Sequence, residues 1–240
     1  MMEEHIHIPT LDSIMKLFDS AIYRVNRAEL LADVFECGAI AISNKVDLKQ
    51  ADEREKRYLQ IINKYSKDER ELIAKIFGEI FSLCSSCTHP LGRFNDWLGE
   101  LYMRSHTSSD KAGQFFTPYN LSKACAKIAI DANIVEQYKK SGEILSITEP
   151  ACGSGGTILA ALENLWVEHK FNYATQCFVE ASDIDSRCVH MCYLQLSLAG
   201  VPAIIKQQDT LSLEKWSVWY TPAYLFQYMK FRKFEKCAQI

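Results

Sequence analysis

The residues best suited to hold a small ligand lie in one stretch, where an apolar run ends in an acid and then in glycines. Residues 144–147 have the aliphatic, β-branched character of a buried strand, and Glu149 follows them, then Gly153, Gly155 and Gly156. Glycine permits backbone angles and close approaches that a Cβ would block, so a ligand can press on the main chain there. The helix expected after the glycines would offer free N–H groups to an anionic ligand group.

Other ligands also use a glycine loop after a first strand, so the order of residues in this loop matters. The run from Gly153 to Gly156 lacks the G-x-G-x-x-G spacing of dinucleotide-binding loops. No Lys-Ser or Lys-Thr pair follows it, as would be expected in a phosphate-binding loop. The alternative to a ligand-binding loop is a strand-to-helix turn in which the glycines only allow the chain to turn tightly.

Two further acids follow strand-like segments. Residues 177–183 predict a second strand that ends in Asp183, about thirty residues after the glycine loop, where dinucleotide folds place the acid that holds ribose hydroxyls. Asp185 is a second candidate for that role, with the alternative of capping the helix expected to follow. A third short strand is expected over residues 202–206, and Asp209 follows it. Each acid has the plain alternative of a helix cap or turn residue.

The elements that must position these residues fall into two parts. Residues 1–92 are expected to form an all-helical domain, because apolar residues such as Ile14 and Phe18 recur at helical spacing. Residues 93–240 are expected to form the α/β domain that carries the glycine loop. The charge-dense residues 47–67 suit a partly exposed helix with i,i+4 ion pairs, and a solvated face is favoured there over a binding surface.

The composition fits a globular protein of one or two domains. The 240 residues are 48% hydrophobic and 24% charged, which is enough apolar material to bury a core. The formal net charge of -3 gives no global attraction to nucleic acid, so a DNA contact would have to be a local patch or come from a partner. No apolar run approaches the ~20 residues that span a bilayer, so no membrane segment is expected.

The nine cysteines are scattered through apolar segments without the density of a disulfide framework, and nothing at the N-terminus resembles a signal peptide. We therefore expect a reducing, cytoplasmic setting. Cys84, Cys87 and His89 have half the spacing of a structural zinc site. No second C-x-x-C pair completes it, so no metal site is expected.

Two segments together resemble a known enzyme family. Residues 113–118 read Gly-Gln-Phe-Phe-Thr-Pro, and residues 149–156 read Glu-Pro-Ala-Cys-Gly-Ser-Gly-Gly about thirty residues later. This pair resembles the adenine-N6 DNA methyltransferases, in particular the modification subunit of type I restriction-modification systems, over about residues 96–211. The resemblance implies an α/β fold of the Rossmann-like class I type, with S-adenosyl-L-methionine as the cofactor.

The resemblance also implies roles for individual residues. In that family the Phe-Thr-Pro turn closes over the methionine end of the cofactor, and the glycine loop packs against the same molecule. By resemblance Asp183 holds the ribose, Ile184 lines the adenine, and Asp209 accepts from the adenine amino group. Glu149 could accept from the ammonium group. The cofactor-binding residues expected in this way are Phe115, Phe116, Thr117, Pro118, Glu149, Ala151, Gly153, Gly155, Asp183, Ile184, Asp209 and Leu211.

The sequence departs from the family at the residues that, in the family, act in methyl transfer to adenine. The family places Asn/Asp-Pro-Pro-Tyr/Phe soon after the acid that corresponds to Asp209, where it holds the flipped adenine and its amino group. This chain contains no Pro-Pro pair, and residues 220–223, Tyr-Thr-Pro-Ala, stand where the motif is expected. Tyrosine and threonine hydroxyls accept hydrogen bonds but lack the geometry of a carboxamide or carboxylate. Tyr220 and Tyr224 are therefore the candidate catalytic residues.

Two functions remain open. One is a DNA methyltransferase, acting in DNA methylation or restriction-modification, that works alone or with a second chain that brings the acceptor groups and reads the DNA. The other is a non-catalytic cofactor-binding or interaction subunit. Because only three strands are expected, the sheet would be C-terminally truncated. Its open edge would need cover from the basic, aromatic residues 228–234, from a partner subunit or from a second copy of the chain.

Overall fold

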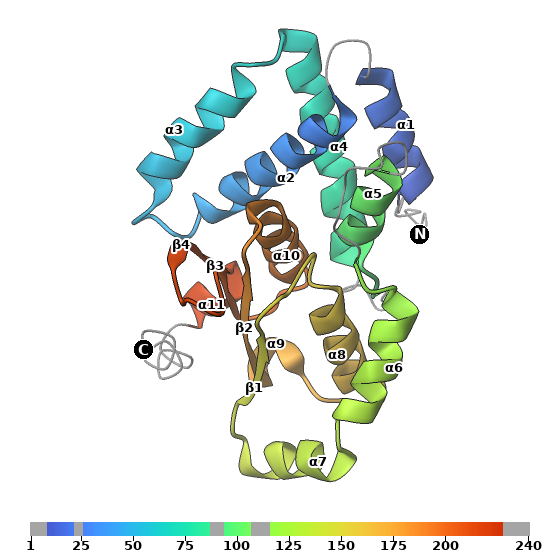
Figure 1. Cartoon of the computed structure of the whole chain (residues 1–240). Helices are drawn as coiled ribbons and strands as arrows, with labels where there is room; N and C mark the ends of the chain where they lie inside the picture. The colour runs from blue at the N-terminus through green and yellow to red at the C-terminus, as the bar shows by residue number, and fades with distance from the viewer. Residues whose placement is uncertain (1–8, 22–25, 87–93, 107–115, 228–240) are drawn as a thin grey trace, which may run out of the picture.

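The computed structural model describes residues 9–21, 26–86, 94–106 and 116–227, and it shows an N-terminal group of helices packed on a mixed sheet (Figure 1). The helices before the sheet are α1 (Leu11–Ala21), α2 (Arg27–Ser43), α3 (Ala51–Ile62), α4 (Lys67–Ser85), α5 (Trp97–His106), α6 (Tyr119–Ala129) and α7 (Ala132–Ser141). The elements that follow are β1 (Leu145–Glu149), α8 (Gly156–Val167), α9 (Tyr173–Gln176), β2 (Cys177–Asp183), α10 (Ser186–Leu198), β3 (Ala203–Gln208), β4 (Lys215–Tyr220) and α11 (Pro222–Phe226).

The N-terminal helices expected from the sequence are confirmed, and local capping sets where two of them begin. Asn26 accepts a hydrogen bond from the backbone N–H of Ala28 at the start of α2. Ser66 and Glu69 form a capping box at the start of α4, in which each side chain accepts from the backbone N–H of the other residue. The buried faces of these helices meet in one core, and α2 packs against α10.

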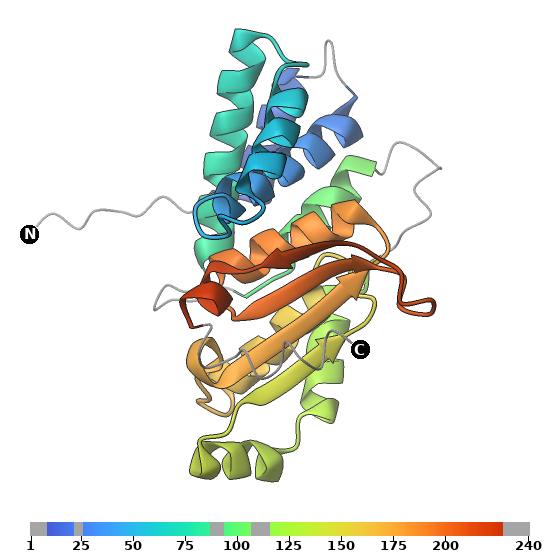
Figure 2. The ribbon, with the colours of Figure 1, turned by 90° about the vertical axis from the view of Figure 1, so that its left-hand side faces the viewer.

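The sheet has the strand order β1-β2-β3-β4, with β1, β2 and β3 parallel and β4 antiparallel to β3. The three expected strands are present, and residues 215–220 add a fourth that the sequence did not indicate. Because β3 and β4 form a hairpin, β4 runs back toward the amino ends of the parallel strands, and α11 follows it there (Figure 2). The carboxyl ends of the parallel strands meet at the opposite edge, where α/β sheets bind ligands.

Helices cover the two faces of the sheet unequally. α10 contacts β2 and β3, α8 lies beside it on the same face, and α6 packs against α8 (Figure 1). On the other face the described cover is α11, whose Tyr224 is fully buried together with Ile144 and Phe178. Ser146 and Thr148 of β1 are exposed on this face. The part of the chain that the structure describes therefore covers this face only near the amino ends of the strands.

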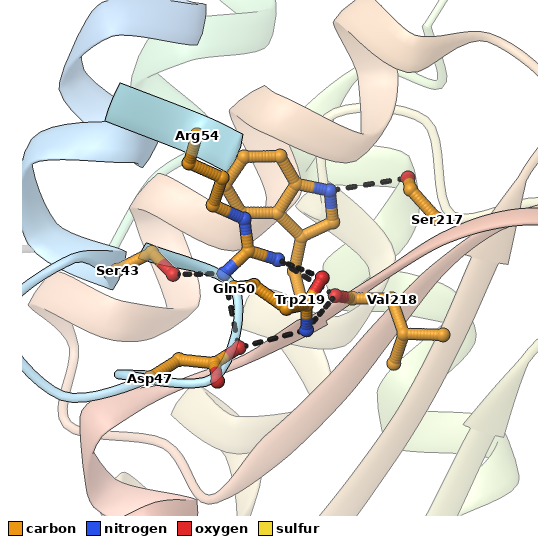
Figure 3. A network of polar contacts seen from close by, with 7 residues as sticks. All are labelled: Ser43, Asp47, Gln50, Arg54, Ser217, Val218 and Trp219. Carbon is orange, nitrogen blue, oxygen red and sulfur yellow. Dashed lines mark hydrogen bonds and ion pairs between the residues drawn. The ribbon is translucent and has the colours of Figure 1, made fainter. Parts of the chain in front are cut away.

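The outer edge of β4 is covered by the first turn of α3 and by the segment that joins α2 to α3. Arg54 donates to the carbonyl oxygen of Val218 over 2.8 Å, and its guanidinium carbon lies 4.0 Å from the ring centroid of Trp219 (Figure 3). The same guanidinium pairs with the carboxylate of Asp47 at 3.0 Å and bonds the hydroxyl of Ser43. Arg54 and Asp47 are 8% and 6% exposed, so this is a buried ion pair. It ties an edge strand that would otherwise present unpaired carbonyls to the helical segment.

A single cluster of buried side chains runs from α1 through α2 and α10 to β4. Its largest fully buried members include Phe35 on α2 and Tyr193 on α10. The helices and the sheet therefore share a core, and the boundary expected at residue 92 falls in a stretch outside the described residues. Among the described residues no strand pairs with the outer side of β1, so the open edge expected of the sheet lies there.

Candidate functional site

The glycine loop between β1 and α8 is a tight turn with left-handed backbone angles. Gly153 and Gly155 have φ angles of 53° and 97°, which residues with a Cβ rarely adopt. The N–H of Cys152 donates to the carbonyl of Ser182 at 2.8 Å, and the N–H of Gly155 donates to the carbonyl of Cys152 at 2.8 Å. The expected order of strand, loop and helix is confirmed, and the loop is anchored to the end of β2 as well as to β1.

Two of the expected acids brace this loop. Asp183, the last residue of β2, accepts from the N–H of Gly153 at 2.9 Å. Glu149, the last residue of β1, accepts from the N–H of Ala151 at 3.2 Å and from the hydroxyl of Thr157 at 3.1 Å. Because each carboxylate oxygen carries two lone pairs, both acids keep acceptor capacity for a ligand.

The two segments that carry the family resemblance meet at the loop. A Cβ built on Gly153 would lie 3.1 Å from the ring of Phe116, so this ring packs directly on the glycine. A hollow of about 110 Å³ lies there, with Thr117 and Ala151 also in its lining. Pro118 is exposed just before α6 begins. The expected contact of Phe115 lies outside the described residues.

A larger hollow of about 510 Å³ adjoins the first and shares Asp96, Phe116 and Thr117 with it. Its lining also includes Glu100 and Met103 from α5. No lysine or arginine is among the described residues that line either hollow. The described part of their lining thus contains acids and no basic side chain, which favours a ligand that carries positive charge over a nucleotide phosphate.

Asp96 joins α5, the glycine loop and α10, and sequence reasoning missed it. Its carboxylate accepts from the hydroxyl of Ser154 at 2.5 Å, from the side-chain amide of Gln195 at 2.8 Å and from the N–H of Gly99 at 3.0 Å. Burial holds the pKa of Asp96 above its usual value, and the hydrogen bonds from Ser154 and Gln195 oppose that rise. The one signal in the sequence is an aspartate just before a helix, which is a usual N-cap position.

The third expected acid lies in the hairpin between β3 and β4, which projects beyond the sheet in Figure 2. Asp209 accepts from the N–H of Leu211 at 2.8 Å, as a turn residue would, and this bond lowers the pKa of Asp209. The hydroxyl of Thr210 donates to the carbonyl of Pro150 at 2.6 Å, so the hairpin is tied to the glycine loop. Ile184 and Leu211 are 60% and 97% exposed. The expected adenine-side residues thus lie at the same edge of the sheet as the loop.

The alternative for Asp185 is confirmed, because it caps α10. Its carboxylate accepts from the N–H of Arg187 at 2.8 Å, and it also forms an ion pair with the guanidinium of that arginine at 2.5 Å. Asp183 is therefore the acid at the end of β2 that remains available to a ligand.

The candidate catalytic tyrosines do not lie with these residues. Tyr220 pairs with Ile204 near the start of β3, because β4 runs antiparallel. Tyr224 is fully buried on α11, where its ring stacks on Tyr220 with centroids 5.6 Å apart and lies 5.9 Å from the ring of Phe178. Thr221 between them is fully buried and accepts from a backbone N–H of β3 at 2.9 Å. This corrects the expected placement: the segment packs near the amino ends of the strands, and the glycine loop lies at their carboxyl ends.

Within the described part of the chain, no group of three or more His, Cys, Asp or Glu side chains could hold a metal ion. Cys84 is buried at the end of α4, whereas Cys87 and His89 lie outside the described residues. None of the helices that the structure describes is both long and apolar enough to cross a membrane.

Two solved structures resemble the chain. The type I restriction-modification system methyltransferase subunit from Streptococcus thermophilus is 18% identical, with a TM-score of 0.40 over 87% of this chain and 40% of that one. A putative class I S-adenosylmethionine-dependent methyltransferase from Listeria monocytogenes is 14% identical, with a TM-score of 0.38 over 87% of this chain and 70% of that one.

Sequence comparison gives a family. The type I restriction enzyme MjaIX methylase subunit of Methanocaldococcus jannaschii is 27% identical over 161 residues, which make up 66% of this chain and 24% of that protein. The chain thus spans about a quarter of the length of this relative. The family model described as N-6 DNA Methylase matches residues 89–232, more than half of the chain and all of its sheet. The chain therefore belongs to the N-6 DNA methylase family.

Proposed function

We propose that the chain binds S-adenosyl-L-methionine at the carboxyl edge of the sheet, in the hollows that Phe116 and the glycine loop line. The observation that carries this proposal is the direct packing of Phe116 on Gly153, which brings together two motifs that lie far apart in the sequence. A Cβ at Gly153 would press on this ring, and the positive φ angle there also favours glycine. The acidic lining of the adjoining hollows suits a cofactor with a sulfonium and an ammonium group.

The residues at this edge can be given roles on chemical grounds. Asp183 would accept from the ribose hydroxyls and Glu149 from the ammonium group, while both hold the loop in shape. Ile184 and Leu211 are exposed apolar side chains that an adenine ring would cover. When bound, the cofactor supplies a methyl group on a positively charged sulfur. The carboxylate of Asp209 would accept a hydrogen bond from the adenine amino group, because its oxygens can accept further bonds beside the one from the N–H of Leu211.

We further propose that the chain acts in adenine-N6 DNA methylation together with another chain. The relative from Methanocaldococcus jannaschii is a methylase subunit of a type I restriction enzyme and is about four times longer than the matched region. Residues 220–223 stand where the family has its acceptor motif, but they pack near the amino ends of the strands, away from the glycine loop. A second chain would then supply the groups that hold the target adenine.

A non-catalytic cofactor-binding subunit is the second candidate, and the same observation about residues 220–223 favours it. The two candidates share the cofactor site and differ only in whether a methyl group reaches DNA. A transfer assay separates them, because it follows the label from the cofactor to adenine.

Calorimetry with S-adenosylmethionine and S-adenosylhomocysteine tests the cofactor site. We expect saturable binding by the unmodified chain and at least tenfold weaker binding by Gly153→Ala, whose new methyl group would press on Phe116. Gly78→Ala is the matched control, because a Cβ there meets nothing within 4 Å and its binding should not change. Absence of binding by the unmodified chain would refute the proposed function.

Transfer is tested with cofactor that carries a radiolabelled methyl group and mixed-sequence DNA. The chain is assayed alone and with the products of neighbouring genes. Label on adenine only in the presence of a second chain supports the partner-completed methyltransferase. Label on adenine from the lone chain would contradict the need for a partner, and binding without transfer under all conditions would favour the non-catalytic subunit.

A further inference from the structure

The carbonyl oxygen of Pro150 connects the carboxyl ends of the three parallel strands. Pro150 directly follows β1, and its carbonyl accepts from the hydroxyl of Thr210 at 2.6 Å and from the hydroxyl of Ser182 at 3.3 Å. Ser182 lies in β2, and Thr210 lies two residues beyond the end of β3. The two hydroxyls are themselves 3.5 Å apart. One carbonyl oxygen therefore links the start of the glycine loop to β2 and to the hairpin that leads into β4.

The hairpin depends on such an anchor because it projects from the sheet (Figure 2), and residues 210–216 are all exposed. Within it, the N–H of Asp209 donates to the carbonyl of Glu214 at 2.9 Å, and the N–H of Leu213 donates to the carbonyl of Asp209 at 2.8 Å. These two bonds fix the shape of the hairpin. The bond from Thr210 to Pro150 instead fixes where the hairpin lies relative to the glycine loop.

Asp209 is the neighbour of Thr210 in the chain and is the acid that this anchor positions. Its carboxylate accepts from the N–H of Leu211 at 2.8 Å and from the N–H of Ser212 at 3.2 Å. These bonds lower the pKa of Asp209, so the group is ionised at neutral pH and can only accept hydrogen bonds. The anchored hairpin therefore holds a hydrogen-bond acceptor at a set distance from the glycine loop.

We propose that Thr210 makes the site selective for the 6-amino group of adenine, because its bond to Pro150 positions the carboxylate of Asp209. The inference rests on the proposed function and adds a positioning residue to it, which acts through Asp209. An acceptor distinguishes a base with an amino group from one without it only within hydrogen-bond distance, about 2.7–3.2 Å. Without its anchor the exposed hairpin would sample other positions, and the carboxylate would spend less time within that distance.

The test compares two ligands that differ only at this group: S-adenosylhomocysteine, and its analogue in which hydrogen replaces the 6-amino group of the base. For the unmodified chain, the dissociation constant of the analogue should exceed that of S-adenosylhomocysteine by about tenfold, because a hydrogen bond to a charged acceptor is lost. In Thr210→Val, which removes the hydroxyl and keeps the shape, this ratio of constants should fall by about threefold to tenfold.

Two matched variants isolate the hydroxyl of Thr210. Thr210→Ser keeps the donor and should retain the ratio of the unmodified chain. Thr148→Val makes the same substitution at an exposed threonine of β1 that lies outside the described lining of both hollows, and it should also leave the ratio unaltered. A fall in either variant as large as that in Thr210→Val would overturn the inference, because the bond to Pro150 would not be its cause.

The ratio separates positioning from a general structural effect, since a loosened site would weaken both ligands together. An unchanged ratio in Thr210→Val would overturn the inference and leave the proposed cofactor site standing. A ratio of one in the unmodified chain would do the same, because there would be no selectivity for Thr210 to produce. Failure of both ligands to bind the unmodified chain would instead refute the proposed function. Where thermal melting shows that Thr210→Val does not fold, Thr210→Ala removes the same hydroxyl and takes its place in the comparison.

Discussion

Replacement of Arg54 by methionine should destabilise the protein strongly, because it breaks a buried ion pair. The guanidinium pairs with Asp47 at 3.0 Å, donates to the carbonyl of Val218 at 2.8 Å and covers the ring of Trp219 (Figure 3). Methionine keeps much of the aliphatic stem and removes all of these polar contacts. Asp47, which is 6% exposed, would then be a buried carboxylate without its cation.

The expected loss can be sized from these contacts. Removal of one partner of a buried ion pair costs about 3–5 kcal/mol, because the remaining charge stays desolvated. Gln50 still donates to Asp47 at 2.8 Å and to the carbonyl of Val218 at 3.4 Å, which limits the penalty at both. We therefore expect a loss of about 3–4 kcal/mol in the free energy of unfolding. At about 2–4 °C per kcal/mol for a chain of this size, the melting temperature should fall by roughly 6–16 °C.

The assay is urea denaturation followed by tryptophan fluorescence, to which Trp219 contributes as one of four tryptophans, and by far-ultraviolet circular dichroism, which reports on the helices. Arg57→Met is the matched control on the same helix, because Arg57 pairs with Glu36 while its side chain is 50% exposed. It should lose less than about 1 kcal/mol. A similar small loss for Arg54→Met would refute the reasoning, since it would show that the contact between α3 and β4 does not stabilise the fold.

Three further changes have defined outcomes. Gly153→Ala should cost about 1–3 kcal/mol in urea denaturation because of its positive φ and its contact with Phe116, whereas Gly78→Ala in an exposed turn of α4 should stabilise by about 1 kcal/mol. Burial lowers the pKa of His190 to about 4, so the stabilising contribution of neutral His190 should be fully present above pH 6.5 and fall by up to about 1.4 kcal/mol per pH unit toward pH 4. The substitution His190→Phe should remove this contribution from the pH dependence of the unfolding free energy. Thr221→Val should destabilise by about 1–3 kcal/mol, because it leaves buried backbone groups without their hydroxyl partner, and a variant of unchanged melting temperature would contradict that structural role.

Features of the site that depend on neighbouring residues could be read from the sequence. The apolar run before Glu149 and the glycines after it predict a strand, a tight loop and a helix, and Gly153 and Gly155 do adopt left-handed angles. Asp185 caps α10 as its position predicts. These features are local, because backbone angles and capping bonds involve residues only a few positions apart.

The placement of Phe116 on Gly153 was expected only because the two motifs resemble those of one family. Periodicity and spacing could not show it, since nothing local relates a turn before α6 to a loop before α8. The resemblance also suggested a role for residues 220–223, and there the structure differs. A motif aligned by order along the chain carries no information about strand direction, which decided the outcome.

The sequence by itself thus determined the loop, the strands that precede the acids and the starts of several helices. Only the tertiary structure decided that β4 turns back, that Arg54 covers its edge, and that Asp96 lies beneath the loop beside Ser154 and Gln195. The contacts of Asp96 and Arg54 join residues 58 to 164 positions apart, and they form because buried polar groups must find partners in the packed core. No local pattern specifies which distant segment provides the partner.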